Sequence, residues 1–400
     1  MKKNIDNYLK SYFLILFFFA IFFLYIKHNV GNDSTISEWL INYTGGFTKR
    51  GLIGQISIYF SNLFSLNLRD SILIFQIFIV GSYFICLYFF LKNILFDRIL
   101  LLAVFTPIFI LFPIAEIEVL ARKEVFIFIF FLGYVSISKD KSNFQNLYKL
   151  IIFPLCILIW EPIIFFVLFW VFLDIVKSQN EKFNLNFFYK FLFYVPAVLI
   201  ALHIVLNPIT NQQHDKMVEF LLLNFNETCY MSCQLLKSKS SIVQQFQGNF
   251  GKYSIEIFVR YFLILLFGFA PLFYLLLNSR LKNNNLIIFN NFRNLFFPFL
   301  IILSPVLFLF AMGYDWGRWV NISYVFSIVS YLYLYKNKLL IVSEDNLKKN
   351  KIILLNKKIF VIIFIIFCFG WNPKTVMTGD VASKPGYAIP YKALKILTQK

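Results

Sequence analysis

The sequence predicts an all-α membrane protein that crosses a bilayer several times. Three observations support this fold class. Of the 400 residues, 59% are hydrophobic and 14% are charged, whereas soluble domains carry about 25% charged residues. Apolar runs recur along the whole chain, and Lys and Arg are concentrated in alternate segments between these runs. A water-soluble globular protein is therefore excluded.

Ten apolar runs are candidate membrane segments, although several are short for a bilayer. They are residues 11–27, 71–91, 99–115, 124–138, 150–176, 190–206, 254–277, 295–312, 319–335 and 359–371. The first run follows Lys2, Lys3 and Lys10, as in a signal sequence, but no small-residue cleavage site comes after it. We therefore expect a retained N-terminal anchor.

The run at 150–176 contains Trp160, Glu161 and Pro162 near its middle. A single span would leave Glu161 in hydrocarbon, at a cost of roughly 2.5–3.5 kcal/mol. Two short helices that meet at these residues avoid this cost, because proline is tolerated in the first turn of a helix and the carboxylate can reach a wet cavity. We therefore predict a hairpin here, and about eleven membrane helices in total with the N-terminus inside.

The distribution of basic residues supports this topology. The segments assigned to the inside hold 21 Lys or Arg in 82 residues, and the outer segments hold 15 in 137. The inside segments are residues 1–10, 92–98, 139–149, 177–190, 278–294 and 336–358. This excess follows the positive-inside rule, which also accounts for the net charge of +18, so nucleic acid is not predicted as a partner. We expect one integral membrane domain, residues 1–400, with outer loops at 28–70 and 207–253 and an outer tail at 372–400.

An unusual cationic segment, TGGFTKRGLIGQ at residues 44–55, follows the first run. Gly45, Gly46 and Gly51 permit close approaches that side chains forbid, and they surround Lys49 and Arg50. Apolar residues recur at helical spacing from Gly51 onward, which predicts a helix lying flat on the membrane. Its N-terminus and the two cations favour a bound phosphate group. The same cations could instead reach lipid headgroups.

Three further outer turns bring charged side chains to the same membrane level. They are AEIEVLARKE with Glu116, Glu118, Arg122 and Lys123, the hairpin with Glu161, and MGYDWGRW with Asp315 and Arg318. Ionisable residues beside membrane segments usually line a polar cavity. The spacing also allows a simpler interpretation, in which Glu118 pairs with Arg122, and Asp315 with Arg318, along a helix.

Taken together, GGFTKRGLIG after the first run, the WEP hairpin and the late DWGRW resemble bacterial membrane proteins of surface-polysaccharide gene clusters. These are O-antigen or capsule polymerases and GT-C-like glycosyltransferases. The likeness covers most of the chain as architecture, through short motifs. It implies an enzyme of the bacterial inner membrane with a periplasmic active face. Its substrate would be a polyprenyl-diphosphate-linked glycan, and its partners would be membrane lipid and other polysaccharide-assembly membrane proteins.

The resemblance also implies roles for particular residues. An acidic residue of the first outer loop, Asp33 or Glu38, would act as the base. Arg50, Arg122 and Arg318 would contact the lipid diphosphate as arginines of outer loops.

The chemistry can also be argued from the residues. Transfer of a glycan from a lipid diphosphate to a sugar hydroxyl needs positive charge on the leaving group and a carboxylate that accepts the proton. Lys49, Arg50, Arg122 and Arg318 are the candidate diphosphate-binding residues. Glu161 is the preferred base, because desolvation would raise its basicity. The other catalytic candidates are Asp315, Glu118 and Glu116.

No cofactor or metal is predicted for this transfer. The alternative function is a flippase or exporter of lipid-linked glycans, which would need similar cations. Such transporters usually contain internal repeats, and the sequence shows none.

Cys229 and Cys233 lie in the second outer loop as CYMSC. A disulfide can form there in an oxidising compartment. A zinc site is disfavoured, because His214 is the one nearby histidine and no second cysteine pair follows. We expect a structural role for this pair.

Overall fold

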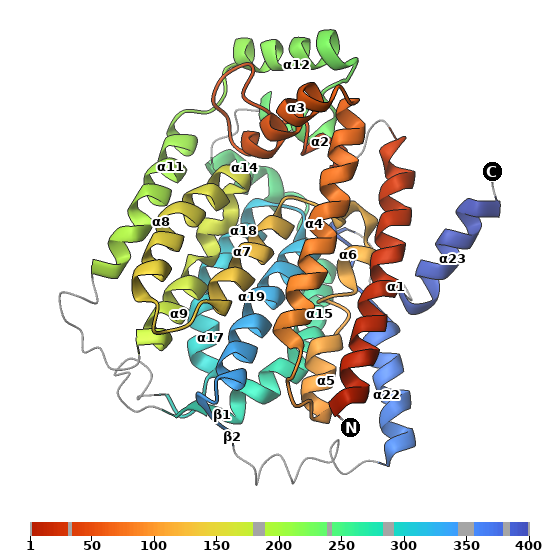
Figure 1. The fold of residues 1–400 in the computed structure, drawn as a ribbon, viewed down its shortest axis with the longest axis vertical. Coiled ribbons are helices and arrows are strands. Elements are labelled where there is room, and N and C mark those ends of the chain that lie inside the picture. The colour runs from red at the N-terminus through yellow and green to blue at the C-terminus, as the bar shows by residue number, and fades with distance from the viewer. Residues whose placement is uncertain are drawn as a thin grey trace.

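The computed structural model describes residues 2–30, 34–178, 189–237, 242–282, 292–342, 356–378 and 385–398 (Figure 1). The predicted all-α class is confirmed, because helices account for almost all regular structure in these ranges. Two three-residue strands are the exception, and they pair antiparallel between Ser279–Leu281 and Leu340–Val342.

The elements follow one another along the chain with short connections. The first half contains α1 (Lys2–His28), α2 (Ser34–Ser37), α3 (Gly51–Phe64), α4 (Leu68–Leu91), α5 (Arg98–Phe105), α6 (Phe112–Ala115), η1 (Ile117–Val119), α7 (Glu124–Ser136), α8 (Ser142–Ile159), η2 (Glu161–Phe166), α9 (Val167–Ser178), η3 (Lys190–Tyr194) and α11 (Val195–Leu206). The second half contains α12 (Asn211–Phe225), α13 (Met231–Gln234), η4 (Leu235–Lys237), α14 (Ile242–Phe250), α15 (Ile255–Leu277), β1 (Ser279–Leu281), α17 (Phe296–Leu303), η5 (Ser304–Val306), α18 (Leu307–Met312), α19 (Trp316–Lys336), β2 (Leu340–Val342), α22 (Lys357–Phe369) and α23 (Pro385–Thr398).

Several helices have the length and apolar composition of membrane spans. Among the described residues four qualify, at Asp6–His28, Leu68–Leu91, Ser142–Ile159 and Ile255–Leu277. The pair Lys190–Leu206 and Asn211–Phe225, bent by 99°, would make a fifth if it is counted as one span. Between 33% and 44% of each of the four spans' apolar windows is buried inside the protein, so most of their apolar side chains face outward. Such a surface suits lipid and is unfavourable in water, and the chain is therefore a helical membrane protein.

The predicted number of eleven membrane helices is wrong. Apolar runs were counted as spans, but several of them are interrupted or short. The run at 99–115 breaks after α5 at Thr106, directly before Pro107, because a residue that precedes proline is disfavoured in a helix. The run at 295–312 passes through a 3-10 turn at Ser304–Val306, and α7 and α22 have 13 residues each, fewer than the roughly 20 that a bilayer needs.

The break in the run at 99–115 is stabilised by α19. The freed carbonyl oxygens of Ile108 and Phe109 accept hydrogen bonds from Asn321 Nδ2 at 2.8 and 3.1 Å. Tyr324 OH donates to Ala103 O at 2.6 Å. Non-helical backbone at membrane depth needs such internal partners, and they come from a helix whose residues Trp316 to Leu334 are all buried. Helix α19 is therefore the central helix of the fold.

The predicted hairpin at residues 150–176 is confirmed, with longer helices than expected. Helix α8 ends at Ile159, Trp160 is extended, and Glu161 opens the 3-10 turn that leads into α9. Helices α8 and α9 then lie side by side, because Lys149 Nζ is 2.9 Å from Asp174 Oδ2. Glu161 therefore lies at the turn of a hairpin rather than in the middle of one span.

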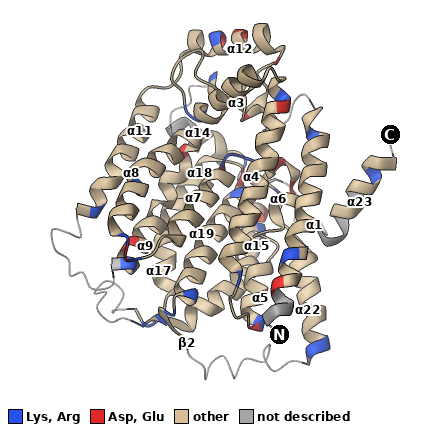
Figure 2. Cartoon of the chain, viewed as in Figure 1, with Lys and Arg blue, Asp and Glu red and all other residues tan. Residues whose placement is uncertain are grey.

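The two ends of the bundle differ in the way that the charge distribution predicted. The N-terminus and the β1–β2 pair lie at the lower end in Figure 1, and α2, α3 and α12 cover the opposite end. Figure 2 shows basic residues near the lower end on α1 and α22 and beside α9. The segments predicted to be outside thus share one end, where they form a cap of short helices.

Helix α3 begins at Gly51, as predicted. Its apolar residues Tyr59 and Leu63 are 70% and 63% exposed. A flat position on the membrane remains a prediction, and this exposed apolar face is what such a position requires.

Candidate functional site

Eight charged side chains from four distant parts of the chain meet beneath the cap. We call them the charge cluster: Glu38, Arg50, Arg122, Lys123, Glu124, Glu161, Asp315 and Arg318. They come from the ends of elements rather than from their middles, namely after α2, before α3, around the start of α7, at the hairpin turn and at the start of α19. The cluster is a product of tertiary structure, because most of its contacts join residues far apart in the sequence.

Arg50 links the glycine-rich segment to the hairpin. Its Nε and Nη2 atoms donate to the two carboxylate oxygens of Glu161 at 2.8 and 2.9 Å. Two parallel hydrogen bonds of this kind fix both the position and the plane of a guanidinium group. Arg50 Nη1 also donates to Glu38 Oε1 at 3.4 Å.

Glu38 lies at the centre of the cluster. Its carboxylate is within 3.4–3.7 Å of Arg50, Arg122 and Arg318, and the residue is 1% exposed. Burial by itself would raise the pKa of Glu38. The surrounding cations, Arg122 foremost, outweigh burial and lower that pKa to about 2. Glu38 is therefore a permanently charged anchor for three arginines.

Arg318 connects α19 to the start of α7. It donates to both oxygens of Glu124 at 2.5 and 2.7 Å and to Asp315 Oδ2 at 3.1 Å. Arg122 donates to the same Asp315 oxygen at 3.2 Å. The Arg318 guanidinium also lies 5.3 Å from the ring centre of Trp319. Asp315 is thus gripped through one oxygen by two arginines.

The backbone around the arginines adopts a conformation that side chains usually avoid. Arg50 and Ala121 have φ values of 62° and 53°, in the left-handed region that is uncommon for residues other than glycine. Hydrogen bonds hold both turns: Lys123 Nζ donates to Arg50 O, and Trp39 Nε1 donates to Ala121 O at 3.0 Å. Strained backbone of this kind persists where the surroundings over-determine it.

Lys123 is fully buried at 0% exposure. Burial lowers the pKa of its ammonium group to about 7, although Glu38 partly opposes this effect. Its hydrogen bond to the Arg50 carbonyl oxygen makes it a positioning residue for Arg50.

The glycines of the 44–55 segment do permit close approach, as predicted, but their neighbours are protein groups. A Cβ atom on Gly54 would lie 2.0 Å from Ile41 O, and one on Gly51 would lie 2.3 Å from the ring of Tyr43. A Cβ atom on Gly45 would lie 1.8 Å from Gln213 O of α12. The glycines therefore dock α3 and α12 onto the chain around Glu38. Whether they also serve a phosphate remains a prediction.

The cluster has an exposed edge and a buried interior. The side chains of Asp315, Arg50 and Glu161 are 29%, 22% and 19% exposed, while the other members are 6% exposed or less. Lys49 lies beside this edge, half-buried, and has no salt bridge to any residue that the structure describes. Burial lowers the pKa of Lys49, and Glu161 partly restores it. With Lys49 the site has five cations and four carboxylates, which leaves a surplus of positive charge for an anion.

Three of the sequence predictions about single residues were wrong. Glu118 is exposed and does not pair with Arg122, because the 3-10 turn and the left-handed Ala121 end any helix between them. Glu116 lies outside the cluster, where it accepts hydrogen bonds from Lys374 at 3.0 Å and Asn372 at 3.2 Å.

The third error concerns the basicity of Glu161. Burial does favour a higher pKa, but Arg50 and Lys49 outweigh it and lower the pKa of Glu161. The expected pair between Asp315 and Arg318 is present at 3.1 Å.

Two residues complete the comparison with the sequence analysis. Asp33, one of the two acidic residues suggested by the resemblance, lies outside the described residues. Glu124 was missed as a member of the cluster. Its position directly after Arg122 and Lys123, at the first residue of an apolar helix, was the available signal, since a carboxylate there is rare without a partner.

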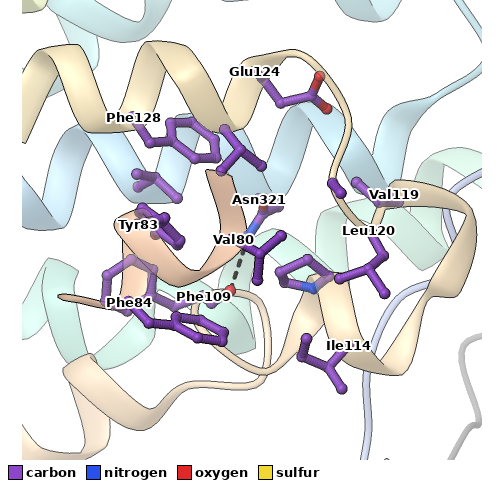
Figure 3. A pocket seen from close by; sticks show the side chains of 14 residues that line it. Val80, Tyr83, Phe84, Phe109, Ile114, Val119, Leu120, Glu124, Phe128 and Asn321 are labelled. Atoms are coloured by element: carbon purple, nitrogen blue, oxygen red, sulfur yellow. Dashed lines mark hydrogen bonds between the residues drawn. The ribbon is translucent and has the colours of Figure 1, made fainter. Parts of the chain in front are cut away.

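A small cavity lies against the cluster between α4, α7 and α19 (Figure 3). Glu124 and Ala121 belong to its wall, together with Tyr83, Phe128 and Asn321. It has room for about one water molecule, and its lining is mostly apolar. It is too small to hold a diphosphate, so a substrate would have to approach from the exposed edge at Asp315, Arg50 and Glu161.

Fold and site together define a helical membrane protein with a buried, interlinked charge cluster beneath its cap. Comparisons with protein-family models, with curated proteins and with solved structures found no match to this chain.

Proposed function

We propose that this chain is a bacterial inner-membrane glycosyltransferase or polysaccharide polymerase. It would transfer a glycan from a polyprenyl-diphosphate carrier to a sugar hydroxyl at the periplasmic face. The observation that carries the proposal is the convergence of Arg50, Arg122 and Arg318 with Asp315 and Glu161 at one edge, with Lys49 beside them. Arginine forks and a lysine suit phosphate oxygens, and a carboxylate beside them suits proton transfer.

In the proposed reaction the acceptor hydroxyl oxygen attacks the anomeric carbon of the carrier-linked sugar. The bond from that carbon to the diphosphate oxygen breaks, and the electron pair leaves with the diphosphate. Lys49 and Arg50 stabilise the charge that develops on the leaving group. The hydroxyl proton passes to a carboxylate as the new glycosidic bond forms.

Asp315 is the preferred proton acceptor in this proposal, in place of Glu161. Both oxygens of Glu161 are bonded to Arg50, so an incoming hydroxyl would have to displace that arginine. Asp315 is more exposed, and the printed hydrogen bonds from Arg122 and Arg318 use its Oδ2 atom alone. Its Oδ1 atom accepts no hydrogen bond from the described part of the chain, which leaves it available to a substrate.

The test uses the full-length protein in lipid nanodiscs with a polyprenyl-diphosphate oligosaccharide. The expected result is release of free polyprenyl diphosphate together with a longer glycan. Asp315→Asn should lower kcat by about 10²–10⁴-fold, the usual contribution of a general base. Glu219→Gln, at an exposed position on α12, is the matched control and should leave the rate unchanged.

Two results would contradict the proposal. The wild-type protein might be folded and release no polyprenyl diphosphate, or Asp315→Asn might keep full activity. If the wild-type protein releases nothing but moves a labelled lipid-linked glycan across a proteoliposome membrane, the flippase alternative replaces the enzyme.

A further inference from the structure

A second cluster of reactive side chains lies in the cap, away from the charge cluster. His214 on α12 faces Cys229 and Cys233, which are joined by a disulfide. The His214 Nε2 atom is 3.6 Å from Cys229 Sγ and 3.3 Å from Cys233 O. All three residues are buried, at 4%, 3% and 0% exposure, and their potential ligand atoms lie within 4.8 Å of one another.

The distance between the imidazole and the sulfur fits a shared metal ion. Zinc binds cysteine sulfur at about 2.3 Å and histidine nitrogen at about 2.0–2.1 Å, with tetrahedral angles. These lengths place a histidine nitrogen about 3.5 Å from a cysteine sulfur in one coordination sphere, close to the 3.6 Å between His214 and Cys229. The two sulfur atoms would have to separate to about 3.8 Å, which requires that the disulfide be reduced.

The surroundings of His214 also resemble those of a metal ligand. The other ring nitrogen, Nδ1, lies 3.4 Å from Asp215 Oδ1. Histidines that bind a metal through one nitrogen usually donate the other N–H to a carboxylate or carbonyl group, which fixes the ring and raises its basicity. Asp215 is itself held by Lys237 at 3.1 Å. The ring is therefore oriented with Nε2 toward the cysteines.

We propose that reduction of the Cys229–Cys233 disulfide converts this cluster into a binding site for one Zn²⁺ ion. In the reduction the disulfide takes two electrons and two protons from an external dithiol, which itself becomes a disulfide. Zn²⁺ then displaces the two thiol protons and binds both thiolates and His214 Nε2. A water molecule takes the fourth position, as in other zinc sites with three protein ligands. Thiolate and imidazole ligands select zinc over magnesium or calcium, which prefer oxygen.

The metal and the disulfide would serve the same structural purpose in two redox states. Ser232, between the two cysteines, donates its backbone N–H to Ser37 Oγ at 3.2 Å, and Ser37 directly precedes Glu38 of the charge cluster. Either crosslink keeps this part of the cap closed beside α2. The site itself does not depend on glycosyl transfer.

The experiment measures zinc bound to the full-length protein in detergent. The protein is treated either with a phosphine reductant or with a thiol oxidant, loaded with Zn²⁺, freed of excess metal and analysed for zinc content. The reduced wild-type protein should retain one zinc ion per chain, and the oxidised protein none. Cobalt added in place of zinc should give a thiolate charge-transfer absorption in the reduced form alone.

Variants separate this site from incidental binding. His214→Gln and Cys229→Ser should abolish retention. Asp215→Asn, at a side chain 60% exposed, should weaken zinc affinity by about 10–100-fold without disturbing the fold. His203→Gln and Cys86→Ser are the matched controls and should retain zinc as the wild-type protein does.

The proposal is overturned if the reduced wild-type protein keeps no more zinc than the oxidised protein. It is also overturned if His214→Gln keeps the same amount as wild type. Should His214→Gln fail to fold, the unchanged or weakened affinity of Asp215→Asn decides the question, because that exposed substitution leaves the buried ligands in place.

Discussion

Removal of the Glu38 carboxylate should strongly destabilise the folded protein. Glu38 lies within 3.4–3.7 Å of three arginines and is almost fully buried. Glu38→Gln removes one negative charge and leaves those guanidinium groups with less compensation. Loss of one partner from a buried ion pair typically costs about 3–5 kcal/mol. The pKa of Glu38, lowered from 4.5 to about 2, corresponds independently to roughly 3 kcal/mol at 1.36 kcal/mol per unit.

The pH dependence of this effect has a definite sign. Because the folded protein lowers the pKa of Glu38, the carboxylate contributes its full stability above about pH 4.5. That contribution is lost as the pH falls toward 2, where the carboxylate becomes protonated in the folded protein as well. The difference in stability between wild type and Glu38→Gln should therefore be largest at neutral pH and should shrink steadily below pH 4.5.

The free energy of unfolding can be measured in detergent micelles by titration with sodium dodecyl sulfate, followed by tryptophan fluorescence. Glu118→Gln is the matched control, because Glu118 is exposed and has no salt bridge within the described residues; it should change stability by less than about 0.5 kcal/mol. If Glu38→Gln is as stable as wild type at pH 7, or if its deficit does not depend on pH, the charge cluster is not assembled around Glu38 as described.

Three further predictions concern the backbone and the topology. Gly54→Ala should destabilise the protein by about 1–3 kcal/mol in the same titration, because the new methyl group would lie 2.0 Å from Ile41 O; Gly248→Ala, with open space around it, is the control, and equal effects would contradict the close packing. Ala121→Gly should preserve or raise stability by up to about 1 kcal/mol, because glycine accepts the φ of 53° without strain; a loss above 1 kcal/mol would mean that the turn is not left-handed. Reporters inserted after Lys139 and after Asn226 should score as cytoplasmic and periplasmic respectively, because these turns lie at opposite ends of the bundle (Figure 1); the same score at both would refute the topology.

Local signals in the chain were sufficient for much of the secondary structure. Gly51 begins a helix because apolar spacing starts there, and the hairpin turns at Trp160 because Pro162 and the charged Glu161 favour a break within an apolar run. The count of spans failed for a related reason. A run such as 99–115 is uniformly apolar whether it forms one helix or two, and its break depends on Asn321 and Tyr324, more than 200 residues away, which bind the freed carbonyl groups.

The candidate site was half foreseen. Its arginines and two of its carboxylates were recognisable because charges beside apolar segments are rare and need a reason to be there. Their pairing could not be read from spacing, as Glu118 and Arg122 show. The bidentate contact between Arg50 and Glu161 joins residues 111 positions apart, and the central role of Glu38 follows from three such long-range contacts.

By itself the sequence determined that this is a helical membrane protein with cations and carboxylates gathered near one face, because composition, apolar periodicity and the bias of Lys and Arg are properties of local stretches. The tertiary structure decided which of those charges are partners, which edge is open to a ligand, and that His214 lies against the two cysteines of the cap. Such contacts depend on how separate helix ends are brought together, and the energy that selects them appears only when the ends are buried side by side.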